Sequence, residues 1–360
     1  MIVLFSIGLL AVILAYLGSR KYLKYGLGLS FFVLWCVYAI RYNYGNDFWN
    51  YSYHFDEISK YKSIVQCFND YEPTWSVLMW LFKFLGFSEF CAFIGFLYNI
   101  IIYRFVKYNV PVKWWPFAVF IYVFNPNLYA LSFSMMRQFL AMSIILYSWD
   151  YLKNGKTLVP FILCILAATI HNSSFVFIPF IFLSYFTNTN DRVWVWVLIG
   201  VFLLLGFSQA FYADALTIMS DQNYLAHYVN EHSMREGTLS FGLGFLILSI
   251  PTFITLYYLY TNNYSRLKIV EWRYISILGI FTTFFSLLGQ LNMLIIRVSY
   301  YFLIFTIGSA PVVLYIMKNR TAKISLMMLF CIGLLYSYLM FISSEVYSPM
   351  FSEFHTIFEK

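Results

Sequence analysis

Two ionisable side chains, Arg137 and His171, stand at the two ends of one apolar hairpin in the sequence. A guanidinium group stays charged and presents a planar fork of donors, which suits phosphate or diphosphate groups. An imidazole accepts a proton, or donates one to phosphate, near neutral pH. An ionisable group at membrane depth is costly and by default marks a functional site. The hairpin is therefore where we expect chemistry, although His171 equally suits a helix cap or a bond to a neighbouring hydroxyl.

The hairpin has two apolar arms, residues 137–152 and 157–171, joined by the turn KNGK. An arm of about 15 residues rises roughly 23 Å as a helix and crosses most of a bilayer core. The two lysines of the turn belong on the cytoplasmic side by the positive-inside rule. Both ionisable residues are thus predicted to return to the opposite face, near the outer boundary of the membrane.

Other polar residues are expected at the same face. Arg41 closes an apolar run six residues before Asp47, and Arg297 opens a later run. For one arginine, snorkelling to the interface is the plainer interpretation, but three on the face where positive charge should be scarce favour a site. Asp47 is either a base or sugar ligand, or a turn residue. Glu72 is either a catalytic carboxylate or a charge that favours a helix N-terminus.

The composition is that of a polytopic membrane protein. The chain is 61% hydrophobic and 11% charged with a mean hydropathy of +0.72, whereas soluble domains hold about 25% charged residues. We expect an all-α protein of about 12 transmembrane helices that forms a single integral membrane domain, residues 1–360. Residues 73–86 are too short for a confident span and are predicted to be re-entrant or interfacial. The predicted spans are 2–17, 26–41, 88–106, 114–132, 137–152, 157–171, 174–186, 193–210, 240–260, 274–292, 297–317 and 324–344.

The charge distribution orients this topology. With the N-terminus outside, the inner loops hold 15 of the 23 basic residues and three of the 16 acidic ones. The net charge of +7 therefore sets membrane orientation, and nucleic acid is not expected as a partner. Positive charge follows the first apolar run instead of preceding it, so we expect a retained helix and not a signal peptide.

Two polar connections, residues 42–75 and 211–239, are predicted to face out. Both mix Tyr and Trp with carboxylates and amides, a combination that stacks on sugar rings and bonds their hydroxyls. The alternative is ordinary membrane-interface structure, which is also rich in Tyr and Trp. The second connection contains a fourth arginine, Arg235. No phosphate-binding glycine loop, metal-ligand spacing or nucleophile motif is present, so neither a cofactor nor a metal is expected.

Several segments together resemble the EpsG-like group of Wzy-type polysaccharide polymerases. The resemblance covers residues 41–186 well and the remainder loosely, and the Gly45-Asn46-Asp47 sequence departs from the small or Thr residue that often precedes this Asp. The segments that carry it are YGNDFWNYSYHF, YEPTWSVLMWLFKFLG, SMMRQFLAMSIILYSWDYLKNGK, LAATIHNSSFVFIPF and RVSYYF.

The resemblance implies a GT-C-like glycosyltransferase of the bacterial inner membrane. Such enzymes join undecaprenyl-diphosphate-linked repeat units of O-antigen, capsule or exopolysaccharide on the periplasmic side, and a chain-length regulator is among their expected partners. Arginine would stabilise the charge that grows on the departing diphosphate, a contribution of a few kcal/mol per donor, without a metal. The implied catalytic residues are His171, Asp47 and Glu72; the diphosphate- or substrate-binding residues are Arg41, Arg137, Gln138, Arg297 and Tyr301.

Three other functions stay open at this point. An O-antigen ligase uses the same donor with a different acceptor. A membrane O-acetyltransferase would usually place its key residues near a cytoplasmic acyl-CoA entry. A lipid-linked oligosaccharide flippase or transporter predicts inverted repeats and charges at the bilayer midplane, whereas the charged candidates here gather at one face.

Overall fold

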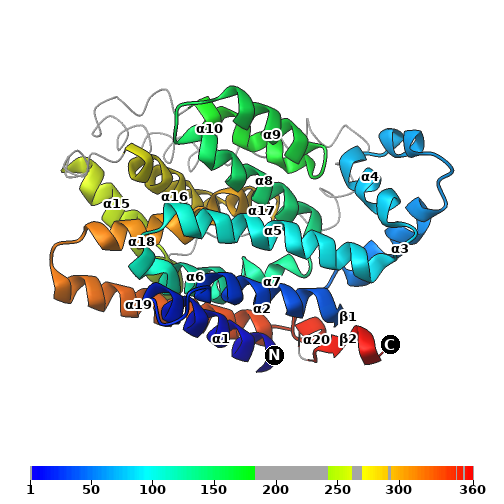
Figure 1. The fold of residues 1–360 in the computed structure, drawn as a ribbon. Coiled ribbons are helices and arrows are strands. Elements are labelled where there is room, and N and C mark those ends of the chain that lie inside the picture. The colour runs from blue at the N-terminus through cyan, green and yellow to red at the C-terminus, as the bar shows by residue number, and fades with distance from the viewer. Residues whose placement is uncertain are drawn as a thin grey trace.

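The computed structural model describes residues 2–182, 242–261, 270–290, 293–345, 347–351 and 353–359. Nearly all of this part is helical, and the long helices lie side by side as one bundle (Figure 1). The all-α prediction is confirmed. The helices of 15 or more residues are α1 (Ile2–Ser19), α2 (Gly26–Ile40), α5 (Phe87–Asn109), α8 (Met136–Leu152), α16 (Val270–Leu288) and α19 (Arg320–Ser343).

Among the described residues, three helices, α1, α5 and α19, are long and apolar enough to cross a membrane. Two shorter helices, α17 and α18, meet at an angle of 55° and together pass the same test. The count of 12 spans and a GT-C-like arrangement therefore stay predictions. The shorter helical segments of the bundle itself are α6 (Trp115–Phe124), α7 (Tyr129–Ser132), α9 (Leu158–Ala168), α10 (Ile178–Phe182), α14 (Leu243–Leu248), α15 (Ile250–Tyr260), α17 (Met293–Leu303), α18 (Thr306–Ile316), η2 (Val112–Trp114) and η3 (Asn172–Phe177).

The predicted span 114–132 is broken in the structure. Helix α6 ends at Phe124, and Asn125 takes an extended conformation before Pro126. Proline lacks an N–H group and biases the preceding residue away from the helical region, which explains the break. The predicted span 193–210 and the connection 211–239 with Arg235 lie outside the described residues.

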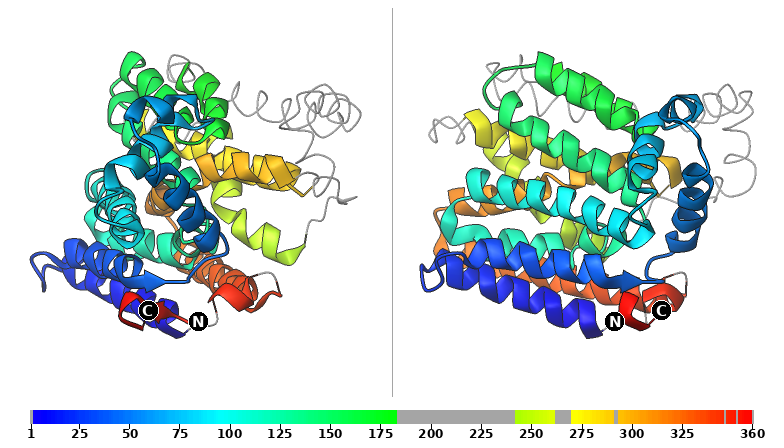
Figure 2. Two further views of the ribbon diagram at one scale, coloured as in Figure 1. Left: turned by 90° about the vertical axis from the view of Figure 1, so that its right-hand side faces the viewer. Right: turned by 45° about the vertical axis from the view of Figure 1, so that its right-hand side comes forward.

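One end of the bundle gathers the chain termini and the first polar connection (Figures 1 and 2). Strand β1 (Arg41–Tyr42) pairs antiparallel with β2 (His355–Thr356), so the C-terminal segment lies against the end of α2. The N-terminus and residues 42–75 thus lie at the same end of the bundle (Figure 1), and the side of a membrane that this end faces stays a prediction. The short elements here are α3 (Phe48–Ser59), η1 (Ile64–Asn69), α4 (Pro73–Phe82), α20 (Ser348–Phe351) and η6 (Ile357–Glu359).

Helix α4 corresponds to the predicted re-entrant or interfacial segment. It has 10 residues, a rise of about 15 Å, which is half the thickness of a bilayer core. It packs against η1 and α3 at the end of the bundle (Figure 1). Its buried Trp75 ring contacts Phe90 of α5 with ring centroids 5.1 Å apart. Helix α4 therefore caps the bundle and brings its first residues to the end of α9.

Candidate functional site

The carboxylate of Glu72 lies between Arg137 and His171. Its Oε2 atom is 2.5 Å from Nη1 of Arg137, and its Oε1 atom is 2.8 Å from Nδ1 of His171. The backbone N–H of Asn172 also donates to Oε1 at 3.4 Å. The predicted hairpin thus brings its two ionisable ends to one place, and a third predicted residue joins them.

The position of Glu72 depends on contacts between α4 and the end of α9. Glu72 immediately precedes Pro73, whose fixed φ suits the first residue of a helix. The Thr74 N–H donates to the Thr169 carbonyl at 3.1 Å, and the two threonine hydroxyls lie 2.7 Å apart. These two bonds fix the start of α4 beside the segment that carries His171.

Glu72 is 7% exposed and is held in its ionised form. Burial by itself would raise the pKa of this carboxyl group. The hydrogen bond from His171 and the charge of Arg137 outweigh burial, and the pKa of Glu72 lies below its usual value. A carboxylate with a low pKa and both oxygens engaged orients its neighbours better than it accepts a proton.

Three polar atoms around this carboxylate lack a partner. They are Nε2 of His171, Nε of Arg137 and Oε1 of Gln138, all shielded from solvent and without a hydrogen bond to the described residues. Buried polar atoms are paired in most proteins, and those that are not need an explanation. A bound substrate that bonds these atoms would supply one.

Asp47 precedes α3 on the other side of Arg137. Its carboxylate interacts electrostatically with both Arg137 and Arg297, while the ring of Tyr51, one turn into α3, lies 5.6 Å from the guanidinium carbon of Arg137. Burial raises the pKa of Asp47 above its usual value, although both arginines act in the opposite direction. Asp47 is therefore the carboxylate of this site that is better suited to receive a proton.

Gln138 and Tyr301 tie helix α17 to the site. The Gln138 side-chain amide donates to the backbone carbonyl of Arg297 at 2.7 Å, which sets the start of α17 beside α8. The buried Tyr301 hydroxyl lies 2.8 Å from the hydroxyl of Ser173 and accepts a bond from Ser174 at 3.1 Å. Ser174 in turn donates to the His171 carbonyl at 2.7 Å. Tyr301 therefore braces the segment that holds His171.

Arg41 contacts a different set of residues from those that surround Glu72. Its guanidinium group, in a residue that is 2% exposed, donates to the Phe133 carbonyl at 2.7 Å and packs 4.0 Å from the Tyr38 ring centroid. Its second terminal nitrogen is 2.8 Å from the sulfur of Met136. These contacts hold the residues just before Arg137, and the predicted contact of Arg41 with diphosphate stays a prediction.

Gly45 docks on the same segment. Its φ is +100°, and a Cβ atom there would lie 2.4 Å from the Phe133 carbonyl oxygen. The next residue, Asn46, donates its N–H to Ser134 Oγ at 3.0 Å. Glycine is therefore required here both for its backbone conformation and for the close approach.

Replacing Gly45 with alanine should displace the segment ahead of Arg137 and strongly reduce any activity of the site. The strained backbone alone costs about 1–3 kcal/mol, and the Cβ clash adds to it. Gly155→Ala is the matched control, because Gly155 has φ +70° with nothing within 4 Å of its added Cβ. Thermal unfolding and activity of both variants check this. An equal loss in the two variants would mean that conformation alone, not the contact with Phe133, matters.

Sequence patterns missed the residues that brace the site. Thr74, Thr169, Ser173 and Ser174 are hydroxyl residues at helix ends, where capping is their ordinary role. Their one signal was proximity to Glu72 and His171 in the sequence. Within the described ranges, no group of three or more His, Cys, Asp or Glu residues could hold a metal ion.

Comparison with known protein families matches residues 24–352 to the EpsG family. The match extends over nearly the whole chain and includes every residue of the Glu72 cluster. The resemblance noted in the sequence is therefore confirmed and reaches well beyond residues 41–186. No curated protein and no solved structure matches the chain.

Proposed function

Because the chain belongs to the EpsG family of Wzy-like polysaccharide polymerases, we propose that it joins oligosaccharide repeat units carried on undecaprenyl diphosphate. The reaction takes place on the periplasmic face of the bacterial inner membrane. The observation that carries this proposal is the Glu72 carboxylate, which bonds Arg137 and His171 at once and leaves the buried Nε2 of His171 without a partner among the described residues.

The arginines serve the donor. As the bond between the anomeric carbon and the diphosphate breaks, negative charge grows on the phosphate oxygens. A guanidinium group has five N–H donors, and Glu72 engages only one terminal nitrogen of Arg137. The other donors of Arg137, together with Arg297, stabilise the departing diphosphate, an effect commonly worth a few kcal/mol per donor.

His171 serves the acceptor. When its Nδ1–H is donated to Glu72, the Nε2 atom carries a lone pair and accepts the proton of the acceptor hydroxyl. That hydroxyl oxygen then bonds the anomeric carbon, and the lipid diphosphate leaves with the electron pair of the broken bond. Glu72 orients the imidazole and stabilises the imidazolium that forms, which removes it from the candidate bases. Asp47 binds an acceptor hydroxyl and stands as the second candidate base.

A reconstituted reaction tests the proposal. Purified full-length protein in nanodiscs is mixed with undecaprenyl-diphosphate repeat unit and a metal chelator, and products are separated as a gel ladder. We expect a ladder with a regular spacing of one repeat unit. A single transfer to lipid A core would identify a ligase, and movement of intact donor across vesicles without any ladder would identify a transporter.

A further inference from the structure

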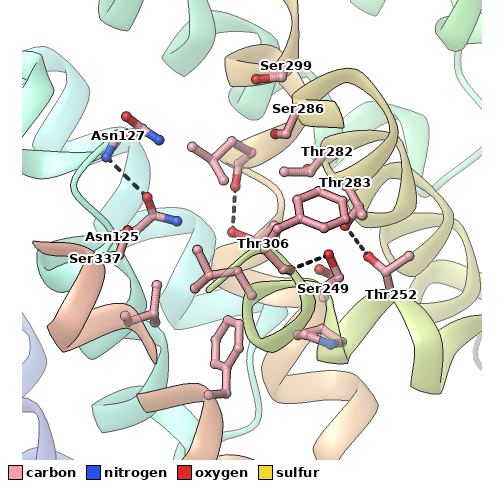
Figure 3. A pocket seen from close by; sticks show the side chains of 18 of the residues that line it. Asn125, Asn127, Ser249, Thr252, Thr282, Thr283, Ser286, Ser299, Thr306 and Ser337 are labelled. Atoms are coloured by element: carbon pink, nitrogen blue, oxygen red, sulfur yellow. Dashed lines mark hydrogen bonds between the residues drawn. The ribbon is translucent and has the colours of Figure 1, made fainter. Parts of the chain in front are cut away.

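A second polar site lies inside the bundle, on the side of α17 away from the Glu72 cluster. It is a cavity of about 170 Å³ between the α6–α7 break and helices α14 to α19 (Figure 3). Half of its lining residues are Ser or Thr, and two more are Asn125 and Asn127. None of the described lining residues is Asp, Glu, Lys, Arg or His. Ser and Thr are common where membrane helices pack closely, but here they border an open space and not a helix contact, so what fills that space calls for an explanation.

Helix α16 contributes a continuous polar face to the cavity. Ser276, Gly279, Thr282, Thr283 and Ser286 line it, at spacings that place them on one side of a helix over about 15 Å. A Cβ atom on Gly279 would lie 2.5 Å from Ser309 Oγ, so this glycine lets α16 and α18 approach closely. This spacing gathers the hydroxyls of α16 on one wall of the cavity.

Helix α17 forms the wall between the two sites. Ile296, Ser299 and Leu303 line the cavity at helical spacing. The Arg297 carbonyl instead accepts a bond from Gln138, and the Tyr301 hydroxyl bonds Ser173, so these two residues are tied to the Glu72 cluster. One short helix thus contacts both sites.

The cavity offers both acceptors and donors. Ser249, Thr255, Ser299 and Thr306 donate their protons to backbone carbonyls three or four residues earlier in the chain, which leaves their oxygens as acceptors toward the cavity. Two other lining hydroxyls, on Ser276 and Thr282, are buried without a partner among the described residues. An unpaired buried hydroxyl is costly, which points to a ligand that bonds it.

We propose that this cavity binds an uncharged sugar ring of the glycan. The inference rests on the polymerase function proposed above. A pyranose presents hydroxyls at its rim and apolar C–H groups on its faces, which matches a lining of hydroxyls and apolar side chains. A diphosphate would find no cation there, and an isoprenoid tail would leave the hydroxyls unpaired. Through α17, a sugar held in the cavity contacts the helix that also carries Arg297 and Tyr301.

Saturation-transfer NMR on the full chain in sugar-free nanodiscs tests the proposal, with glucose, galactose and N-acetylglucosamine as probes. We expect a signal from at least one sugar in the wild type and in Arg137→Ala. The double variant Ser276→Ala/Thr282→Val should weaken binding about 10-fold, because two hydrogen bonds are lost. Thr321→Val, an exposed change on α19, is the control and should leave binding unchanged.

Three outcomes would overturn the cavity assignment. The first is the absence of a signal in the wild type, which would mean that the cavity holds water only. The second is an undiminished signal in the double variant. The third is loss of the signal in Arg137→Ala, which would place the sugar at the charged cluster. The gel ladder is scored separately. A ladder without a sugar signal would refute only the proposed sugar site in the cavity. A sugar signal without a ladder would refute only the proposed polymerase activity.

Stability provides an independent readout of the same hydroxyls. Thr282→Val keeps the side-chain shape and removes an unpaired hydroxyl, so its thermal unfolding temperature should be equal to or above that of the wild type. Thr252→Val is the matched variant in the same cavity. The Thr252 hydroxyl lies 2.6 Å from that of Thr283, so this substitution breaks a hydrogen bond and should lower the unfolding temperature. If Thr282→Val also lowered the unfolding temperature, its hydroxyl would serve the fold and not a ligand.

Discussion

Arg137→Ala is expected to abolish polymer while the protein still reaches the membrane. The substitution removes the donors that face the departing diphosphate, and losing a donor to developing charge commonly costs about 10²–10³-fold in turnover. The cellular polymer, resolved by length on a gel, and the reconstituted ladder both measure this. Polymer of normal length and amount from a variant present at wild-type levels would sink the assignment of the site.

The same substitution has a second effect that must be separated from the first. It leaves the buried Glu72 carboxylate with hydrogen bonds to the His171 ring and the Asn172 N–H but without its arginine. Breaking a buried ion pair costs about 3–5 kcal/mol, but the Arg137 side chain is 36% exposed, so solvent screening reduces the cost. Arg137→Ala/Glu72→Gln removes the uncompensated charge and should recover stability without recovering polymer. Recovery of polymer in this double variant would limit the role of Arg137 to neutralising Glu72.

The sequence was sufficient to predict that Arg137 and His171 come together at one end of a hairpin. The lysine-containing turn and two apolar arms of equal length oriented one hairpin, and this placed Arg137 and His171 at the same end. Glu72 could not be placed in the same way, because it is 65 and 99 residues away from them in the chain. Its position depends on how the short helix α4 docks, and no periodicity encodes that docking.

Arg41 and Arg137 share one sequence pattern, an arginine at the boundary of an apolar run, but have different surroundings in the structure. In the sequence Arg41 stands at the end of an apolar run, as Arg137 stands at the start of one, and both fit the same expectation. The structure separates them by environment: Arg137 meets a carboxylate, whereas Arg41 meets a carbonyl, sulfur atoms and aromatic rings. Apart from the Tyr38 ring, those partners come from residues 50 to 95 positions away, a distance over which sequence patterns carry no information.

The hydroxyl cavity was missed because each Ser or Thr alone is unremarkable in a membrane helix, where it bonds its own backbone. The signal that sequence reasoning could have used is the spacing of Ser276, Thr282, Thr283 and Ser286 on one helical face. Even so, the contributions of α15, α17 and α18 to the same cavity required the tertiary structure.

His171→Gln is expected to lose turnover and keep donor binding. Glutamine preserves polarity and approximate size, but it cannot accept a proton near neutral pH, and positioned bases commonly contribute about 10²–10⁴-fold. Binding of the lipid-diphosphate donor should change little, since the arginines that hold it remain. Turnover is measured from the initial rate of ladder formation, and binding by titration of the donor into the same nanodiscs. Equal losses of binding and turnover would show that His171 is structural.

Glu72→Gln and Asp47→Asn distinguish the orienting carboxylate from a rival base. The first variant keeps a hydrogen-bond acceptor for Nδ1 of His171 but removes the charge that stabilises an imidazolium, so turnover should fall less than in His171→Gln. The acid limb of the pH profile of kcat/KM reports the protonation of the free enzyme's base. If His171 is that base, the limb disappears in His171→Gln and persists in Asp47→Asn. The reverse pattern would identify Asp47 as the base, a role that its raised pKa suits. His171 would then be the partner that keeps Glu72 in place.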